Sequence, residues 1–136
     1  MDDTPGLTQS RYMLFSKLER SDTVREFFHS VADDVVWTLH GNHPLAGEYR
    51  SKQDFLSATV ERLHPLTRNG IQFLVKRLHV GYPVTAAEME STSIGLDGKP
   101  YDQIYAWICR FDHDTIVDVH AYVDSVAVVD FLRRHE

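Results

Sequence analysis

The sequence predicts an α+β fold in which a long, curved, mostly antiparallel sheet wraps helices on its concave side. The first observation is the order of elements: two helices, a strand and a third helix precede four strands in succession, and strands joined by short turns usually pair antiparallel. The second is the stretch Tyr101–Asp124, which predicts two strands and then a helix start. Its first strand is apolar on both faces, so we expect helices on one face and a second sheet or subunit on the other.

The helices follow from apolar spacing and capping residues. A first helix is predicted from Gln9 to Arg20, after a loose arm over residues 1–8 that is rich in Asp, Thr, Pro and Gly. Ser21-Asp22 is predicted to cap a second helix, because apolar side chains recur at i, i+3, i+4 and i+7 over 24–31. Ser51, followed three residues later by an Asp, resembles a capping box and opens a third helix.

The strands follow from β-branched and aromatic runs bounded by turn residues. Asp124 then precedes a closing helix, for which it is a good N-cap. The expected strands are 35–39, 71–80, 84–94, 101–111 and 116–123.

Composition limits the function classes. The 136 residues fit one domain, 1–136, and no apolar run approaches the roughly 20 residues of a membrane span. The net charge of −6 and the scattered Lys and Arg residues argue against a nucleic-acid partner. The first ten residues do not resemble a signal peptide, and the single Cys109 excludes an internal disulfide. We therefore expect a cytoplasmic protein without a membrane partner.

One face of the 101–111 strand looks like the wall of a ligand pocket rather than a dry core. It carries Tyr101, Gln103, Tyr105 and Trp107, whose polar atoms need partners when buried. An amide that faces an apolar interior is the sharpest case, so Gln103 is predicted to meet either a bound ligand or a buried backbone group.

Four segments carry a resemblance to a known family. In this order and spacing they resemble the SnoaL-like, ketosteroid-isomerase-like branch of the nuclear-transport-factor-two-like superfamily, over almost the whole chain. The segments are VADDVVW at 31–37, AGEYRSKQDFL at 46–56, DGKPYDQIYAW at 97–107 and TIVDVHAYVDS at 115–125.

The resemblance implies a cone-shaped barrel whose curved sheet wraps three helices from the N-terminal half, with a short C-terminal helix. It also implies a homodimer packed through the outer sheet face and a deep apolar cavity. Relatives isomerise steroids through a dienolate, cyclise polyketides or hydrolyse epoxides, all on small apolar molecules. Many other relatives have no known activity, so a non-catalytic binding domain is the alternative.

The catalytic positions of the family transfer only in part. The isomerases' carboxylate base matches Leu39 or, with one gap, His40, and their protonated acid matches Trp107. Ala121 stands where many relatives have an acid before the last strand's Tyr. The inward face is thus expected to be poor in carboxylates.

The candidate catalytic residues are therefore few. His40 is predicted as a general base in a loop at the cavity mouth, Tyr105 as a hydrogen-bond donor to an oxyanion, and Asp124 as a proton-transfer group or simply a helix cap. Glu88 and Glu90 share a strand face and would supply a base only if that face is the inner one.

The ligand-binding candidates are mainly aromatic. Trp37 and Trp107 would flank a flat ligand, the Trp107 indole also donating to an enolate, and Tyr12 on the first helix would reach the cavity. The full set predicted to bind ligand is Tyr12, Trp37, Tyr101, Gln103 and Trp107.

Three functions remain open from the sequence. The first is an isomerase, cyclase or epoxide-hydrolase-like enzyme that uses acid/base chemistry without metal or organic cofactor. The second is a binding domain that uses the same cavity. Both predict a cavity of several hundred Å³. The third, a dimeric interaction module, predicts a hollow filled by side chains.

Overall fold

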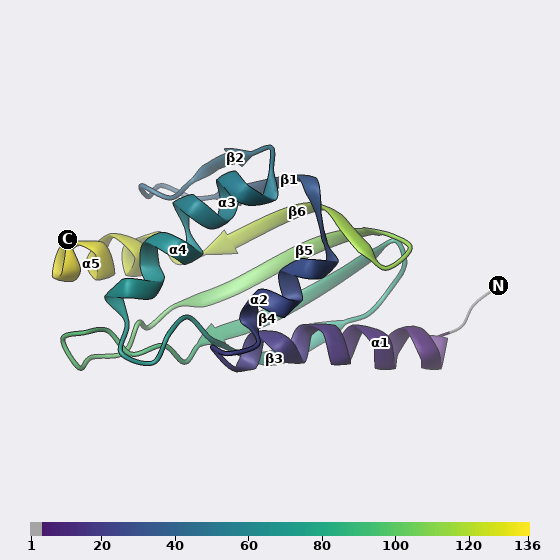
Figure 1. Ribbon diagram of the computed structural model, residues 1–136, viewed down its shortest axis with the longest axis horizontal. Helices are drawn as coiled ribbons and strands as arrows, with labels where there is room; N and C mark the ends of the chain where they lie inside the picture. The colour runs from purple at the N-terminus through teal and green to yellow at the C-terminus, as the bar shows by residue number, and fades with distance from the viewer. Residues whose placement is uncertain (1–3) are drawn as a thin grey trace.

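A curved six-stranded sheet forms one layer of the molecule, and the helices cover its concave face (Figure 1). The computed structural model describes residues 4–136, with side chains from residue 6. The strands are β1 (Val31–His40), β2 (Gly47–Tyr49), β3 (Phe73–His79), β4 (Val84–Ser91), β5 (Ile104–Asp112) and β6 (Thr115–Val123). The helices are α1 (Thr4–Ser16), α2 (Val24–Phe27), α3 (Lys52–Ala58), α4 (Val60–Leu63) and α5 (Ser125–His135), with 3-10 turns at Lys17–Glu19, Phe28–Ser30 and His64–Leu66.

The sheet order is β2-β1-β6-β5-β4-β3. The four C-terminal strands pair antiparallel in succession, as the sequence predicts. β1 instead lies parallel to β6, with Trp37 beside Val119. Strands β2 and β3 form the two edges, so the sheet wraps the helices like part of a cone without closing on itself.

The first helix begins earlier than predicted. α1 starts at Thr4, so the prediction of a loose arm over 1–8 is wrong for residues 4–8, while residues 1–3 lie outside the described part of the chain. The sequence has Pro5 in the first turn, where a proline costs no hydrogen bond because that N–H has no partner within a helix.

The second helix is shorter than predicted. α2 and its 3-10 turn end at Ser30, and Val31 begins β1 rather than closing the apolar stripe of the helix. The pairing of β1 with β6 shifts register between Val31 and Val36, and Asp33 and Asp34 are exposed there. Asp33 and Asp34 therefore lie within β1, on an irregular stretch of that strand, and not in a connection between α2 and β1.

Two predicted helix caps are confirmed. Ser51 Oγ accepts from the backbone N–H of Asp54 (3.0 Å) and opens α3. Asp124 Oδ1 accepts from the N–H groups of Val126 (2.9 Å) and Ala127 (3.2 Å) and opens α5. The three-residue strand β2 was not predicted, because it is short and begins at Gly47.

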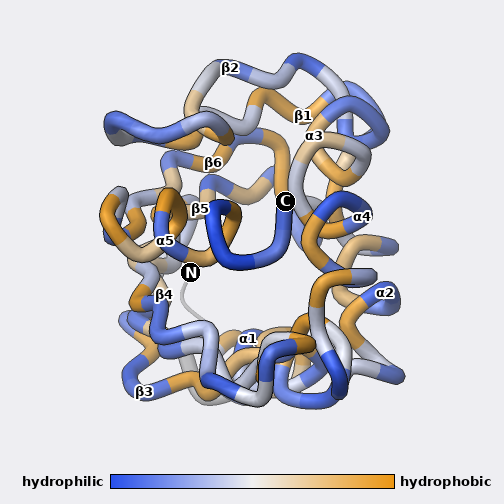
Figure 2. The backbone as a smooth tube through the Cα atoms, turned by 90° about the vertical axis from the view of Figure 1, so that its left-hand side faces the viewer, coloured by the Kyte–Doolittle hydropathy of each residue, from blue (hydrophilic) through white to orange (hydrophobic). Residues whose placement is uncertain are grey.

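The alternation predicted for β5 is also confirmed. Trp107, Cys109 and Phe111 are buried on the concave side, while Ile104 and Ile108 are exposed on the convex side. Figure 2 looks along the molecule from the end at which α5 lies, and it shows the strands on the left, α2, α3 and α4 on the right, and α1 along the bottom. No helix within residues 4–136 is long and apolar enough to cross a lipid bilayer.

Candidate functional site

A cavity of about 60 Å³ lies between the concave face of the sheet and α3, α4 and α5. It is far smaller than the several hundred Å³ predicted for a ligand pocket. Sheet, helices and connecting segments all contribute to its wall. The lining residues are Trp37, Leu39, Leu45, Phe55, Thr59, Val60, Leu63, Ile71, Phe73, Tyr101, Tyr105, Trp107, Ala121, Val123 and Val128.

Aromatic rings explain the small volume. Trp37 stacks on Phe55, with ring centroids 4.0 Å apart and planes 19° apart, and meets the edge of Trp107 at 5.0 Å. Phe73 packs edge-on against Trp107 (5.4 Å) and Tyr105 (4.8 Å). The rings bridge the space between β1, β5 and α3, so most of the hollow implied by the curvature is filled. Four of the predicted residues, Trp37, Tyr101, Tyr105 and Trp107, nevertheless line this cavity.

The polar groups of the lining are neutral. Among residues 6–136, whose side chains the structure describes, no Asp, Glu, Lys, Arg or His lines the cavity. Burial raises the pKa of Tyr101 to about 12 and, with the neighbouring Tyr101, raises the pKa of Tyr105 well above its usual value. Both phenols therefore stay protonated near neutral pH, and the Tyr101 hydroxyl accepts a hydrogen bond from Gln103 Nε2 (3.1 Å).

His40 does not lie at the cavity mouth, and its predicted placement is wrong. It is the last residue of β1 and alternates with the inward-facing Trp37 and Leu39, so it faces the convex side. There its Nε2 lies 2.9 Å from His120 Nδ1, and its ring stacks on Tyr122 with centroids 4.5 Å apart. The sequence did not indicate this, because β1 runs one residue further than predicted. His40 is thus separated from the cavity by the sheet.

The side-chain amide of Gln103 forms hydrogen bonds with the backbone of Asp124 and not with a ligand. Gln103 is 1% exposed, and its amide bonds the backbone of Asp124 and the hydroxyl of Tyr101. The alternative partner predicted for Gln103, a buried backbone group, is therefore the correct one. The Asp124 carboxylate is exposed and caps α5, so it does not reach the cavity.

Tyr12 is also placed away from the cavity. It is 51% exposed on α1, and the neighbouring Arg11 takes the buried position instead, with its guanidinium 3.7 Å from the Phe111 ring. The inward stripe of α1 therefore does not contain the tyrosine.

Several cavity residues were not singled out as binding residues from the sequence. Leu39 follows Trp37 by two residues and shares its face, and Phe55, Thr59 and Leu63 follow the helical spacing of 51–63. These signals identify inward-facing residues, but they do not tell a cavity wall from ordinary core.

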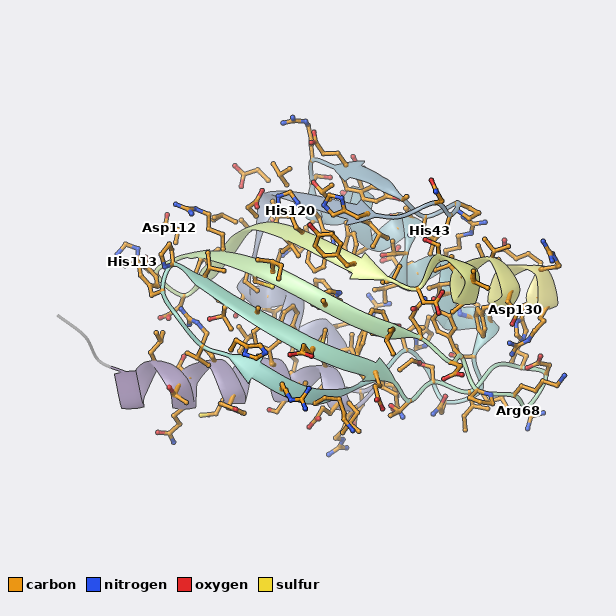
Figure 3. All side chains as sticks on the ribbon, turned by 180° about the vertical axis from the view of Figure 1, so that it is seen from behind. His43, Arg68, Asp112, His113, His120 and Asp130 are labelled. Carbon is orange, nitrogen blue, oxygen red and sulfur yellow. The ribbon has the colours of Figure 1, made fainter. Side chains whose placement is uncertain are left out.

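The convex face carries the remaining candidates. Figure 3 looks onto this face, which none of the described helices crosses, with His120 labelled on it. Glu88 lies there with His79, whose Nε2 is 2.6 Å from Glu88 Oε2, and this hydrogen bond is the main cause of the lowered pKa of Glu88. Glu90 shares the face, 3.9 Å from Lys76. The two acids therefore do not supply the missing base of the cavity.

Solved structures of low sequence identity share this arrangement of sheet and helices. An NTF2-like protein from Burkholderia thailandensis has a TM-score of 0.71 at 20% identity, over 97% of this chain and 98% of that chain. Bal32a, from a soil-derived mobile gene cassette, has a TM-score of 0.73 at 11% identity, over 95% and 97%.

The chain has the NTF2-like fold. The resemblance to the SnoaL-like part of that superfamily, read from four sequence segments, is therefore confirmed as a statement about fold. IdmH of Streptomyces antibioticus, a proposed polyketide cyclase, is another structural neighbour, with a TM-score of 0.66 at 14% identity over 93% of this chain and 97% of that chain.

One curated protein is also similar in sequence. The dimerizing cyclase phiC of a fungal species is 27% identical over 115 residues, which cover 82% of this chain. The match covers 51% of phiC, so the chain spans about half the length of this curated relative. No protein-family model matches the chain.

Proposed function

We propose that this NTF2-like chain binds a small apolar molecule in the aromatic cavity and promotes its cyclisation or isomerisation. The observation that carries the proposal is the composition of the lining, a wall of aromatic and aliphatic side chains with a few neutral donors. Such a wall removes an apolar ligand from water and orients it through a few hydrogen bonds. The cyclase names of phiC and IdmH support this reaction class.

The chemistry assigned to the cavity is polarisation of a carbonyl rather than proton abstraction. Tyr105, kept protonated by burial, would donate to an oxygen on which negative charge develops. A donor in a water-poor site stabilises negative charge on that oxygen more than it does in water. The substrate would react as its enol, whose O–H proton passes to the new alkoxide oxygen in a cyclisation or returns to carbon in an isomerisation, so no side-chain base is required. Epoxide hydrolysis is disfavoured, because activating a water molecule requires a proton acceptor, and the lining described above offers donors. The proposal needs no metal or organic cofactor.

The bound state requires the cavity to widen. The helical segment over 52–63 is interrupted at Thr59, whose φ and ψ of −121° and −81° are not helical, and α4 beyond it has four residues. Val60 and Leu63 on α4 line the cavity, so a shift of this short helix enlarges it without disturbing the sheet.

A second candidate function is a dimeric interaction module whose hollow is filled by side chains. The cavity volume of about 60 Å³ favours it, since a drug-sized ligand requires several hundred Å³. The two candidates differ in one measurable property, which is whether any small molecule stabilises the fold.

The convex sheet face is proposed as the surface of a homodimer. It exposes apolar side chains over four adjacent strands, which a solvated sheet face would normally avoid. A second copy of this chain presents the same apolar surface and would cover it, as an isologous interface requires. The exposed apolar residues are Leu74, Val84, Ile104, Ile108 and Tyr122. A cytoplasmic location, which suits the free thiol of Cys109, is part of the same proposal.

Ligand-dependent thermal stabilisation tests the proposed function. We expect members of a panel of steroids, aromatic polyketides and terpene epoxides to raise the melting temperature, because a ligand that binds only the native state stabilises it. The control is Ala121→Leu, which places a larger side chain in the cavity wall and should abolish the shift while the variant remains folded. If no compound shifts the melting temperature of the natural chain, the interaction module is the better description.

A further inference from the structure

Trp37 has a buried hydrogen-bond donor without a partner. Among the side chains of residues 6–136, two nitrogen atoms are buried and unpaired, Nε of Arg11 and Nε1 of Trp37. The guanidinium of Arg11 still donates through its other nitrogens, to the carboxylate of Asp114 and the backbone oxygen of His113. An indole has a single donor, so Trp37, which is 1% exposed, has no polar partner at all.

The surroundings of Trp37 offer its N–H no acceptor from a side chain. Its ring lies against Phe55, Trp107 and, at 6.0 Å, Phe28. A buried N–H without a partner costs about 1–3 kcal/mol, which is why natural cores rarely keep one. Trp37 also lines the cavity, so a molecule bound there is the available source of an acceptor.

The other polar groups of the lining define what kind of molecule fits. Tyr105 carries a hydroxyl that interacts with the Ser91 side chain, and Thr59 Oγ1 donates to the backbone oxygen of Phe55 (2.6 Å). The described lining carries no cation to balance an anionic ligand and no anion to balance a cationic one. A neutral ligand with an acceptor oxygen satisfies these conditions.

We propose that the indole N–H of Trp37 selects neutral carbonyl compounds, such as ketones or lactones, by donating a hydrogen bond to the carbonyl oxygen. The inference rests on the proposed function, since it names the substrate class of the same cavity. In the reaction proposed above, the same bond would strengthen as charge builds on that oxygen.

The two tryptophans of the chain make the test direct. Trp37 and Trp107 are the only tryptophans in the sequence and both line the cavity, so the two indole N–H resonances of the ¹⁵N-labelled protein report on it separately. The probes are cyclohexanone and methylenecyclohexane, which share a ring and an exocyclic double bond and differ in the carbonyl oxygen. We expect the Trp37 indole proton to move downfield with cyclohexanone and not with methylenecyclohexane.

Affinities from the same titrations complete the test. One hydrogen bond should improve the affinity for cyclohexanone, relative to the affinity for methylenecyclohexane, by about 3–10-fold over a site that lacks the donor. Trp37→Phe should therefore lower the ratio of the two affinities by about 3–10-fold, whereas the matched control Trp107→Phe should leave the ratio unchanged. The indole shift is measured on the natural chain, so it stands even if Trp37→Phe folds poorly.

The contrary outcomes separate the two proposals. An affinity ratio that is the same in the natural chain and in a folded Trp37→Phe variant, or a Trp37 indole proton that moves equally with both probes, would overturn the role of Trp37 and leave the pocket in place. If neither probe perturbs either indole resonance at millimolar concentration, the binding function itself is wrong, and the role of Trp37 falls with it.

Discussion

The side-chain amide of Gln103 holds both backbone groups of Asp124. Nε2 donates to the Asp124 carbonyl (3.0 Å), and Oε1 accepts from the Asp124 N–H (2.7 Å). Gln103 immediately precedes β5, and Asp124 joins β6 to α5. The pair therefore fixes the point at which β6 ends and α5 begins. Oε1 also accepts from the N–H of Ile104 (3.0 Å).

Replacing Gln103 by Leu should therefore destabilise the fold rather than alter ligand choice. The change leaves partly buried backbone groups of Asp124 without partners and removes the buried amide bond to Tyr101, and we expect the free energy of unfolding to fall by about 2–4 kcal/mol. Urea denaturation followed by far-UV circular dichroism measures it. The matched change Gln53→Leu, on the exposed face of α3, should stay within about 0.5 kcal/mol of the natural chain. Equal stability of the two variants would contradict the structural role of Gln103.

The ion pair between Asp97 and Arg134 predicts a pH dependence of stability. Arg134 donates to Asp97 through Nε (2.7 Å) and Nη2 (3.1 Å), and these bonds are the main reason that the pKa of Asp97 lies far below its usual 3.8. A carboxyl group with a lowered pKa in the folded state stabilises the fold above its unfolded pKa and loses that contribution as the pH falls.

The natural chain should therefore be more stable than Asp97→Asn at pH 7, and this difference should shrink as the pH falls below about 4. Urea denaturation at a series of pH values from 7 to 2.5 measures it. Asp102→Asn, which changes an exposed carboxylate in the same connection, is the control and should differ little from the natural chain throughout. A pH-independent difference for Asp97→Asn would show that the carboxylate charge does not matter there.

The proposed homodimer interface on the convex face predicts that a single charged substitution there prevents dimerisation. Ile104 is 59% exposed in the proposed interface, so Ile104→Asp should convert dimers to monomers, because the interface would have to bury an unpaired carboxylate. Sedimentation velocity distinguishes the two species. Val126→Asp introduces the same charge at a position on α5 that is 76% exposed, and this variant should stay dimeric. If the natural chain sediments as a monomer, the proposal of a homodimer is wrong.

The position of His40 on the convex face predicts that removing its side chain does not change the affinity for a cavity ligand. His40→Ala should leave the dissociation constant of any cavity ligand unchanged, because the sheet separates the imidazole from the cavity. Tyr105→Phe, which removes one donor from the lining, should weaken a carbonyl ligand about 3–10-fold. Quenching of tryptophan fluorescence measures both. If His40→Ala weakens binding while the dimer persists, the cavity is not the binding site.

The sequence by itself determined the features that depend on neighbouring residues. The alternation of Trp107, Cys109 and Phe111 fixed which face of β5 is buried, because successive side chains of a strand point to opposite sides. Ser51 and Asp124 were identified as caps because a cap bonds N–H groups two or three residues onward. These relationships act over a few residues, so the local pattern contains them.

Only the tertiary structure decided the contents of the cavity. The parallel pairing of β1 with β6 joins residues about 80 positions apart and turns His40 toward His120 on the convex face. The cavity volume depends on how Trp37, Phe55 and Trp107 stack, and they come from three separate elements. Whether a buried polar group finds a partner is likewise a property of the packed chain, which satisfied Gln103 and left the indole of Trp37 unpaired.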